Sequence, residues 1–116
     1  MNNYHSGHFA ETLALAYLRL KGYSKLADNY VTGKGTGAGE VDLIVRKGNI
    51  IVFVEVKKRT TIENAAYAIT IKQQTRIRRA AEAFLATFPQ YANCDIRFDA
   101  VLVQFPYKIE HIKNAF

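Results

Sequence analysis

The sequence predicts an α/β fold with a mixed central sheet flanked by helices. One observation is the order of patterns along the 116 residues: a helix-type pattern, three extended runs, a second helix and two closing extended runs. The other is the size of the chain, which with 49% hydrophobic residues can form one core but is too short for two. We therefore expect a single domain covering residues 1–116.

The first helix is expected from His8 to Lys21, where apolar residues recur at helical spacing and Gly22 then acts as a stop signal. The apolar stripe expected on this helix is Phe9, Leu13, Ala16, Tyr17 and Leu20. A short strand is expected over residues 24–31. The glycine-rich residues 32–39 after it predict a loop.

Two extended runs follow, Glu40–Lys47 and Asn49–Lys57, joined by a tight turn at Gly48. Residues 60–69 carry few signals and are expected to be a linker. Thr70 and Gln73 then form a capping-box pattern at the start of a second helix, which ends near Pro89. Its expected apolar stripe is Ile77, Ala80, Ala81, Phe84 and Phe88. Alternating patterns at residues 95–105 and 108–116 predict the closing strands.

The composition favours an anionic partner and the cytoplasm. Sixteen Lys and Arg residues against ten Asp and Glu residues give a formal charge of +6 and a pI near 9.6, which suits a polyanion such as nucleic acid. A single cysteine, Cys94, cannot form an internal disulfide and has no ligand cluster around it, so we expect a reducing compartment and no zinc site. No apolar run approaches membrane-spanning length, and no membrane association is expected.

Charged residues interrupt the two aliphatic runs in "GEVDLIVRKGNIIVFVEVKKR". A two-residue turn pairs Lys47 with Ile50, and the same register places Asp42 opposite Glu55. Alternation places Asp42, Ile44, Phe53, Glu55 and Lys57 on one face and Val41, Leu43, Val45, Val52, Val54 and Val56 on the other. Opposed carboxylates repel, so a shared proton, a neighbouring cation such as Lys57 or a divalent metal ion must compensate.

Lys57 lies two residues beyond Glu55 on the same face, within reach of a phosphate oxygen. Carboxylates for a metal beside a lysine suit phosphodiester hydrolysis. A purely structural alternative is a salt-bridged face, in which Glu40 pairs with Lys57 across the hairpin and Asp42 with Arg46.

Asp42 followed by Glu55-Val56-Lys57 resembles the D…ExK active site of the PD-(D/E)XK nuclease superfamily. More closely, "GEVDLIVR", "IIVFVEVKKR", "ITIKQQTRIRRAAEAFL", "RFDAV" and "IEHIKNAF" resemble, in this order, the YraN-like family of small endonuclease-like proteins, related in fold to archaeal Holliday junction resolvases. The resemblance covers nearly the whole chain and implies a restriction-endonuclease-like α-β-β-β-α-β core. One departure is the glycine-rich approach "VTGKGTGAGE", which leaves the substrate contacts there open.

The resemblance also implies roles for individual residues. The implied ligands of Mg²⁺ or Mn²⁺ are Asp42, Glu55, the carbonyl of Val56 and, from the first helix, Glu11. Lys57 is expected to assist the attacking water. Glu40 is a supporting residue, either as a partner of Lys57 or in the outer shell of the metal. A solvated position on the helix surface is the alternative for Glu11.

Basic residues on the second helix form a candidate surface for nucleic acid. Lys72, Arg76 and Arg79 recur at i, i+4 and i+7, and could bind backbone phosphates or simply form a solvated helix face. Lys34, Lys58 and Arg59 would extend this surface around the site. The sequence thus favours a metal-dependent endonuclease acting on DNA, with branched or damaged DNA as candidate substrates. The alternatives are a non-catalytic nucleic-acid-binding module and an assembly subunit, such as one half of a homodimer.

Overall fold

The computed structural model describes residues 3–33, 38–58, 69–104 and 108–116. Its elements follow the predicted order of one helix, three strands, one helix and two strands. They are α1 (Asn3–Leu20), β1 (Ser24–Thr32), β2 (Gly39–Lys47), β3 (Ile50–Lys58), α2 (Ile71–Thr87), a 3-10 turn η2 (Pro89–Tyr91), β4 (Asp95–Gln104) and β5 (Lys108–Ile112). The linker expected over residues 60–69 lies almost wholly outside the described residues.

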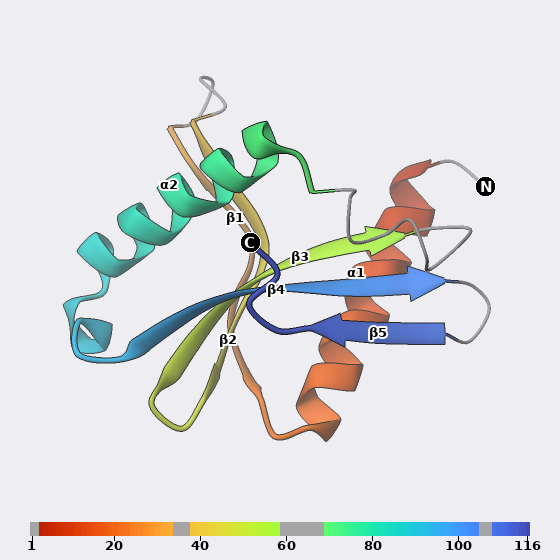
Figure 1. Ribbon diagram of the computed structural model, residues 1–116, viewed down its shortest axis with the longest axis horizontal. Helices are drawn as coiled ribbons and strands as arrows, with labels where there is room; N and C mark the ends of the chain where they lie inside the picture. Colours follow the sequence, from red (N-terminus) through yellow and green to blue (C-terminus); the bar gives the residue numbers. More distant parts are fainter. Residues whose placement is uncertain (1–2, 34–37, 59–68, 105–107) are drawn as a thin grey trace.

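The five strands form one sheet in the order β1-β2-β3-β4-β5. Only β3 and β4 are parallel, and the other three neighbouring pairs are antiparallel, so the predicted mixed sheet is confirmed. The parallel pair arises because the chain returns through α2 between β3 and β4. In Figure 1, α1 lies behind the sheet and α2 in front of it, so each face has its own helix.

The core has a separate cluster on each face of the sheet. The cluster on the α1 face contains Ala10, Ala14, Leu18, Tyr23, Leu43, Val45, Val52, Val54, Val101 and Val103. The cluster on the α2 face contains Val41, Ile44, Ile51, Phe53, Ile77, Ala80, Ala81 and Phe84. Successive side chains of β3 therefore pack alternately toward α1 and toward α2. Because both faces are covered, this strand is hydrophobic along most of its length.

The stripe by which α1 contacts the sheet differs from the predicted one. The buried residues are Ala10, Ala14 and Leu18, whereas Phe9 and Leu20 are 51% and 88% exposed. Apolar residues surround most of this helix, so helical spacing alone does not select the buried face. Two alanines at i and i+4 leave room for close packing, and that decides which side faces the sheet.

The hairpin confirms the predicted register near its turn and departs from it at the other end. Lys47 pairs with Ile50, and the ladder continues to Leu43 and Val54, where it ends. The expected ladder pair of Asp42 with Glu55 is therefore not formed. The alternation of β2 also changes between Leu43 and Val41. The sequence predicts both side chains on one face, but Val41 packs on the α2 face and Leu43 on the α1 face. The end of the ladder frees the two strands to separate beside the acidic residues.

The predicted capping box at the start of α2 is confirmed. The Thr70 hydroxyl accepts a hydrogen bond from the Gln73 N–H, and the Gln73 side chain accepts one from the Thr70 N–H, both at 3.1 Å. β5 is shorter than expected and ends at Ile112, since Asn114 adopts a left-handed conformation with φ of 52° that a strand cannot continue. Among the described residues, no helix has the length and apolar character needed to cross a membrane.

Candidate active site

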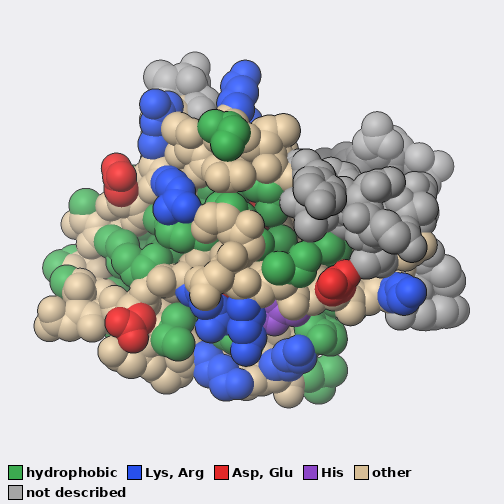
Figure 2. Space-filling model, in the orientation of Figure 1, with side chains coloured by type: hydrophobic (Ala, Val, Ile, Leu, Met, Phe, Trp, Pro, Cys, Tyr) green, Lys and Arg blue, Asp and Glu red, His purple; other side chains and the backbone are tan. Residues whose placement is uncertain are grey.

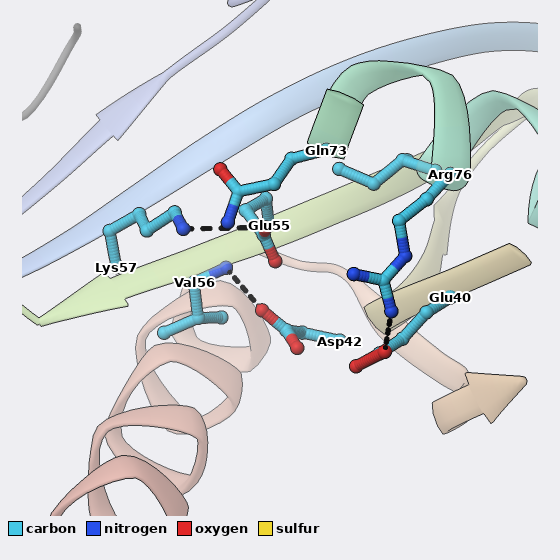
Figure 3. Close-up of a pocket in the computed structure, with 8 residues that line it drawn as sticks. Glu40, Asp42, Glu55, Val56, Lys57, Gln73 and Arg76 are labelled. Atoms are coloured by element: carbon cyan, nitrogen blue, oxygen red, sulfur yellow. Dashed lines mark hydrogen bonds and ion pairs between the residues drawn. The ribbon is translucent and has the colours of Figure 1, made fainter. Parts of the chain in front are cut away.

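A cavity of about 250 Å³ opens where β2 and β3 separate, beneath the first turns of α2 (Figure 3). It is lined by Glu40, Asp42, Glu55, Val56, Lys57, Gln73, Arg76 and Ile77. Five of these come from the hairpin and three from α2. The cavity therefore brings together the two segments in which the sequence predicts catalytic and nucleic-acid-binding residues.

Asp42 occupies the gap left by the end of the ladder. Its Oδ2 accepts a hydrogen bond from the Val56 N–H at 2.8 Å, where a regular β2 would have offered a backbone carbonyl. The side chain is half-buried and held between the strands. This contact fixes one carboxylate oxygen of Asp42 against β3.

Glu55 and Glu11 both lie close to Asp42, and both have raised pKa values. The pKa of Glu55 is raised from 4.5 to about 9, first by burial and then by the hydrogen bond and charge of Asp42. The pKa of Glu11 on α1 is raised from 4.5 to about 7, again first by burial and then by the charge of Asp42, while a hydrogen bond with Asn29 opposes the shift. The structure thus gathers the carboxylates of Glu11 and Glu55 around that of Asp42.

Lys57 provides a cation within the cavity. Its Nζ lies 3.7 Å from Glu55 Oε2, and both side chains are largely buried, at 13% and 12% exposure. The charge of Lys57 lowers the pKa of Glu55 but is outweighed by burial and by Asp42. One lysine is therefore too little positive charge for the carboxylates around it.

Glu40 does not pair with Lys57 as the hairpin register predicts. Its Oε2 accepts a hydrogen bond from Arg76 Nη2 on α2 at 2.7 Å, in a partly exposed ion pair. The structural alternative of an Asp42–Arg46 pair is not formed either, since the Arg46 Nε donates to the Gly48 carbonyl at 2.9 Å. The first correction arises because β2 turns toward α2 once its ladder with β3 has ended.

Gly39 allows β2 to approach α2 this closely. A Cβ at this position would lie 2.9 Å from the Ala80 backbone nitrogen and would clash with the Thr32 hydroxyl. No side chain larger than hydrogen fits there without a shift of α2. The glycine therefore sets the distance at which Glu40 meets Arg76.

The predicted nucleic-acid-binding residues differ in their distance from the cavity and in their exposure. Arg76 lines the cavity, whereas Lys72 and Arg79 on α2 and Lys58 at the end of β3 are exposed. Figure 2 shows Lys and Arg side chains over α2 and again along the lower edge of this face. Lys34 and Arg59 lie outside the described residues.

The cavity contains few of the side chains that usually hold a metal ion. No group of three or more His, Cys, Asp or Glu side chains within residues 3–33, 38–58, 69–104 and 108–116 is arranged as a metal site. Magnesium, however, needs only one or two protein carboxylates, because waters and substrate phosphates complete its shell. Asp42 and Glu55 supply these, and the raised pKa of Glu55 indicates that positive charge is lacking there. The residues fit a hard divalent cation such as Mg²⁺ or Mn²⁺.

A second acidic centre was not predicted from the sequence. Asp99 on β4 is fully buried and accepts hydrogen bonds from Arg97 at 2.8 and 2.9 Å, His111 at 2.7 Å and the Asn114 N–H at 3.1 Å. Arg97 also donates to the Tyr23 hydroxyl at 2.7 Å. The signal was an Arg and an Asp two residues apart in the aliphatic strand "RFDAV", where alternation puts both on one face.

Gln73 was also missed as a site residue. The sequence gives it only a capping role, but its side chain lines the cavity beside Lys57 and Arg76 (Figure 3). Gln73 is the third residue of α2, and it reaches the cavity because the first turn of this helix lies over the cavity. The position of the helix over the sheet depends on the tertiary structure and cannot be predicted from the capping pattern.

Comparison with known proteins places the chain in a family. The model of the family described as "Uncharacterised protein family UPF0102" matches residues 10–103. A UPF0102 protein from Paramagnetospirillum magneticum is 51% identical over 110 residues, covering 94% of this chain and 84% of the relative. A UPF0102 protein from Bradyrhizobium diazoefficiens is 43% identical over 113 residues, covering 97% and 82%. The chain belongs to the UPF0102 family, also called the YraN family, as the sequence resemblance implied.

The fold is similar to that of a solved Holliday junction resolvase. The structure of Hjc, a Holliday junction resolvase from Archaeoglobus fulgidus, matches with a TM-score of 0.53 and covers 89% of this chain and 72% of that chain. The sequences are 13% identical, so this likeness concerns the fold. It confirms the expected mixed sheet flanked by helices.

Proposed function

We propose that this protein is a metal-dependent endonuclease that hydrolyses phosphodiester bonds in DNA. The observation that carries the proposal is the convergence of Asp42 and Glu55 from two strands on one cavity that also holds Lys57, with Glu11 of α1 close to Asp42. Buried carboxylates at such close range destabilise a fold unless a bound proton or a cation compensates their charge. The resolvase-like fold and the D…ExK pattern support the same conclusion.

Each residue has a distinct role in this proposal. Asp42, Glu55 and the Val56 carbonyl hold Mg²⁺ or Mn²⁺, and Glu11 joins through a second ion or a water. When bound, the metal ion supplies positive charge to the phosphate and lowers the pKa of a water molecule. Lys57, held against Glu55, orients the attacking water or takes its proton. In-line attack then leaves a 5′-phosphate and a 3′-hydroxyl.

The exposed basic residues of α2 contribute to DNA binding in this proposal. Lys72 and Arg79 contact backbone phosphates beside the cavity, and Lys58 continues this surface at the end of β3. Such contacts carry no sequence preference, so branched or damaged structure is the expected basis of selection. Action on two strands would favour a homodimer, and the cytoplasm is the expected location.

A binding module without catalysis is the second candidate. The cationic surface of α2 would serve it equally well, but carboxylates that repel phosphate would weaken it. The presence of Asp42 and Glu55 in the same cavity as Arg76 therefore favours the nuclease.

The two candidates are separated by cleavage of single-stranded, duplex, flapped and four-way DNAs in Mg²⁺ or Mn²⁺. We expect the wild type to cut at least one substrate, and Lys57→Ala to cut it on the order of 1000-fold more slowly while keeping most of its affinity. Equal cutting by both proteins would point to a contaminating nuclease. Binding without any cutting would support the binding module.

A further inference from the structure

The most informative unassigned feature of the cavity is the pair of hydrogen-bond donors that α2 presents to it. Gln73 and Arg76 lie one turn apart and both line the cavity beside Lys57. Each is held by a residue outside the carboxylate cluster: Gln73 by Thr70 and Arg76 by Glu40. The catalytic roles proposed above use neither of these supporting contacts.

The capping box determines which end of the Gln73 amide faces the cavity. The Thr70 N–H needs an acceptor, and Gln73 Oε1 provides it at 3.1 Å. A side-chain amide has one acceptor and one donor group, so the Nε2 group is turned the other way. Figure 3 shows this nitrogen directed toward Lys57 and Glu55, with the oxygen turned away. The helix cap thus presents a neutral donor to the cavity.

The ion pair with Glu40 holds Arg76 in a similar way. Only Nη2 bonds to Glu40, at 2.7 Å, and Nε is buried without a hydrogen-bond partner among the described residues. A guanidinium can donate to a phosphate through two nitrogens at once. Arg76 therefore has unused donor capacity, and Glu40 keeps it at the cavity rather than in solvent.

The carboxylates of the cavity explain why such donors are needed. Glu40, Asp42 and Glu55 line the cavity and can each compete with a DNA phosphate for the donors of Lys57 and Arg76. A phosphate that enters the cavity therefore needs donors that remain directed at it. Preset donors reduce the ordering required on binding.

The geometry points to a phosphate clamp on α2, in which Gln73 Nε2 and the Arg76 guanidinium bind a backbone phosphate of the DNA and Glu40 and Thr70 are positioning residues. The choice of DNA as the ligand rests on the proposed nuclease function. The test does not depend on cleavage, because it measures DNA affinity. It assigns Glu40 to the arginine instead of the metal shell. It also gives Gln73 a role besides helix capping.

The test uses anisotropy of a fluorescent duplex DNA with the full chain in Ca²⁺ at several salt concentrations. Gln73→Glu keeps an acceptor for the Thr70 N–H but removes the donor, and Arg76→Ala removes the guanidinium. We expect each to raise the Kd about tenfold, and Arg76→Ala to lower the slope of log Kd against log salt by about 1. The matched controls are Thr75→Glu, which adds the same charge on the exposed side of the same turn, and Arg19→Ala on α1. Both should stay within about twofold of the wild type.

Glu40→Gln provides the complementary arm. Its amide oxygen can still hold Arg76, but the competing charge is gone, so DNA should bind about threefold more tightly. Mn²⁺ affinity, measured by electron paramagnetic resonance, should not change in this variant. A tenfold loss of Mn²⁺ affinity would instead make Glu40 a metal ligand and would overturn its positioning role.

The outcomes separate the clamp from the nuclease. If Gln73→Glu and Arg76→Ala bind DNA as tightly as their controls, the clamp is wrong, even if the wild type cuts DNA. If the wild type binds but does not cut, the nuclease fails and the variants still decide the clamp. A wild type that binds no DNA overturns both. Circular dichroism of Gln73→Glu, expected to match the wild type, verifies that α2 remains capped.

Discussion

The molecule has two acidic centres on one sheet, and they show opposite electrostatics. At both Asp99 and Glu55 burial acts to raise the pKa of the carboxyl group. At Asp99, hydrogen bonds from His111, Arg97 and the Asn114 N–H more than offset this, and the pKa falls below its ordinary value of 3.8. At Glu55 the hydrogen bond and the charge of Asp42 add to the effect of burial, and the pKa rises to about 9.

The difference separates a structural carboxylate from one that needs a ligand. Asp99 has its partners within the chain and joins β4 to β5 and to the C-terminal residues. Around Asp42, carboxylates face one another with a single lysine nearby. Buried charges without internal compensation occur chiefly at functional sites, which is why we propose that the active site lies here and not at Asp99.

The largest effect is expected on cleavage by Asp42→Asn. The amide oxygen can still accept the hydrogen bond of the Val56 N–H, so the fold should be kept while a charged ligand is lost. DNA cleavage in Mg²⁺ should fall on the order of 1000-fold, with no loss of thermal stability. A fall in melting temperature as large as that of an Asp99 variant would contradict the distinction between the two centres.

Next in size is the loss of stability in Asp99→Asn. This change leaves Arg97 buried without its counter-ion, which typically costs about 3 kcal/mol. Urea unfolding should show this decrease, and the control Asp95→Asn, at an exposed position of the same strand, should show almost none. Wild-type stability in Asp99→Asn would mean that the network is not structural.

Metal binding should change the free energy of unfolding by a similar amount, and only through the carboxylates around Asp42. Mg²⁺ or Mn²⁺ at about a hundredfold above its Kd should stabilise the wild type by about 2.7 kcal/mol. The gain should vanish in a Glu55→Gln variant that also carries Asp42→Asn, and should persist in Asp99→Asn. Thermal melts with and without EDTA measure it, and an equal gain in all three proteins would place the metal elsewhere.

The pH dependence should have opposite signs at the two centres. Glu55 and Glu11 have raised pKa values, so the folded state binds more protons than the unfolded state and the metal-free protein loses stability as pH rises. The loss should run from about pH 4.5 to 7 for Glu11 and to 9 for Glu55. Asp99, with a lowered pKa, contributes stability that disappears as pH falls through and below 3.8.

Urea unfolding of metal-free Glu55→Gln checks this assignment. The variant cannot lose a proton at position 55, so its stability should decline less between pH 7 and 9 than that of the wild type. Parallel curves for the two proteins would show that Glu55 is not the titrating group.

Features that depend on local spacing could be predicted from the sequence. The hairpin register near Gly48, the capping box of Thr70 and Gln73, and the order of helices and strands all follow from short segments and are confirmed. Asp42, Glu55 and Lys57 were noticed because charges interrupt an aliphatic strand, and the structure brings them to one cavity, while their catalytic roles stay predictions. The single domain and the cytoplasmic location stay predictions.

Features that depend on packing between distant segments could not be predicted. The register rule continued the hairpin ladder to Asp42 and Glu55, but β2 leaves β3 to meet α2, where Gly39 allows close contact. The buried side of α1 is set by alanines that fit the sheet, not by the largest side chains. Arg97, His111 and Tyr23 meet at Asp99 from three segments, and only the Arg-x-Asp spacing hinted at this.

The hydrogen bond from the Val56 amide to Asp42 makes the site observable by spectroscopy. This N–H points at a carboxylate instead of a backbone carbonyl, so its chemical shift depends on the charge of that carboxylate. In a ¹⁵N-labelled sample, one backbone resonance would therefore follow metal occupancy and protonation of the site without any added probe. The same signal would report whether an inactive variant has lost its ligand or only its lysine.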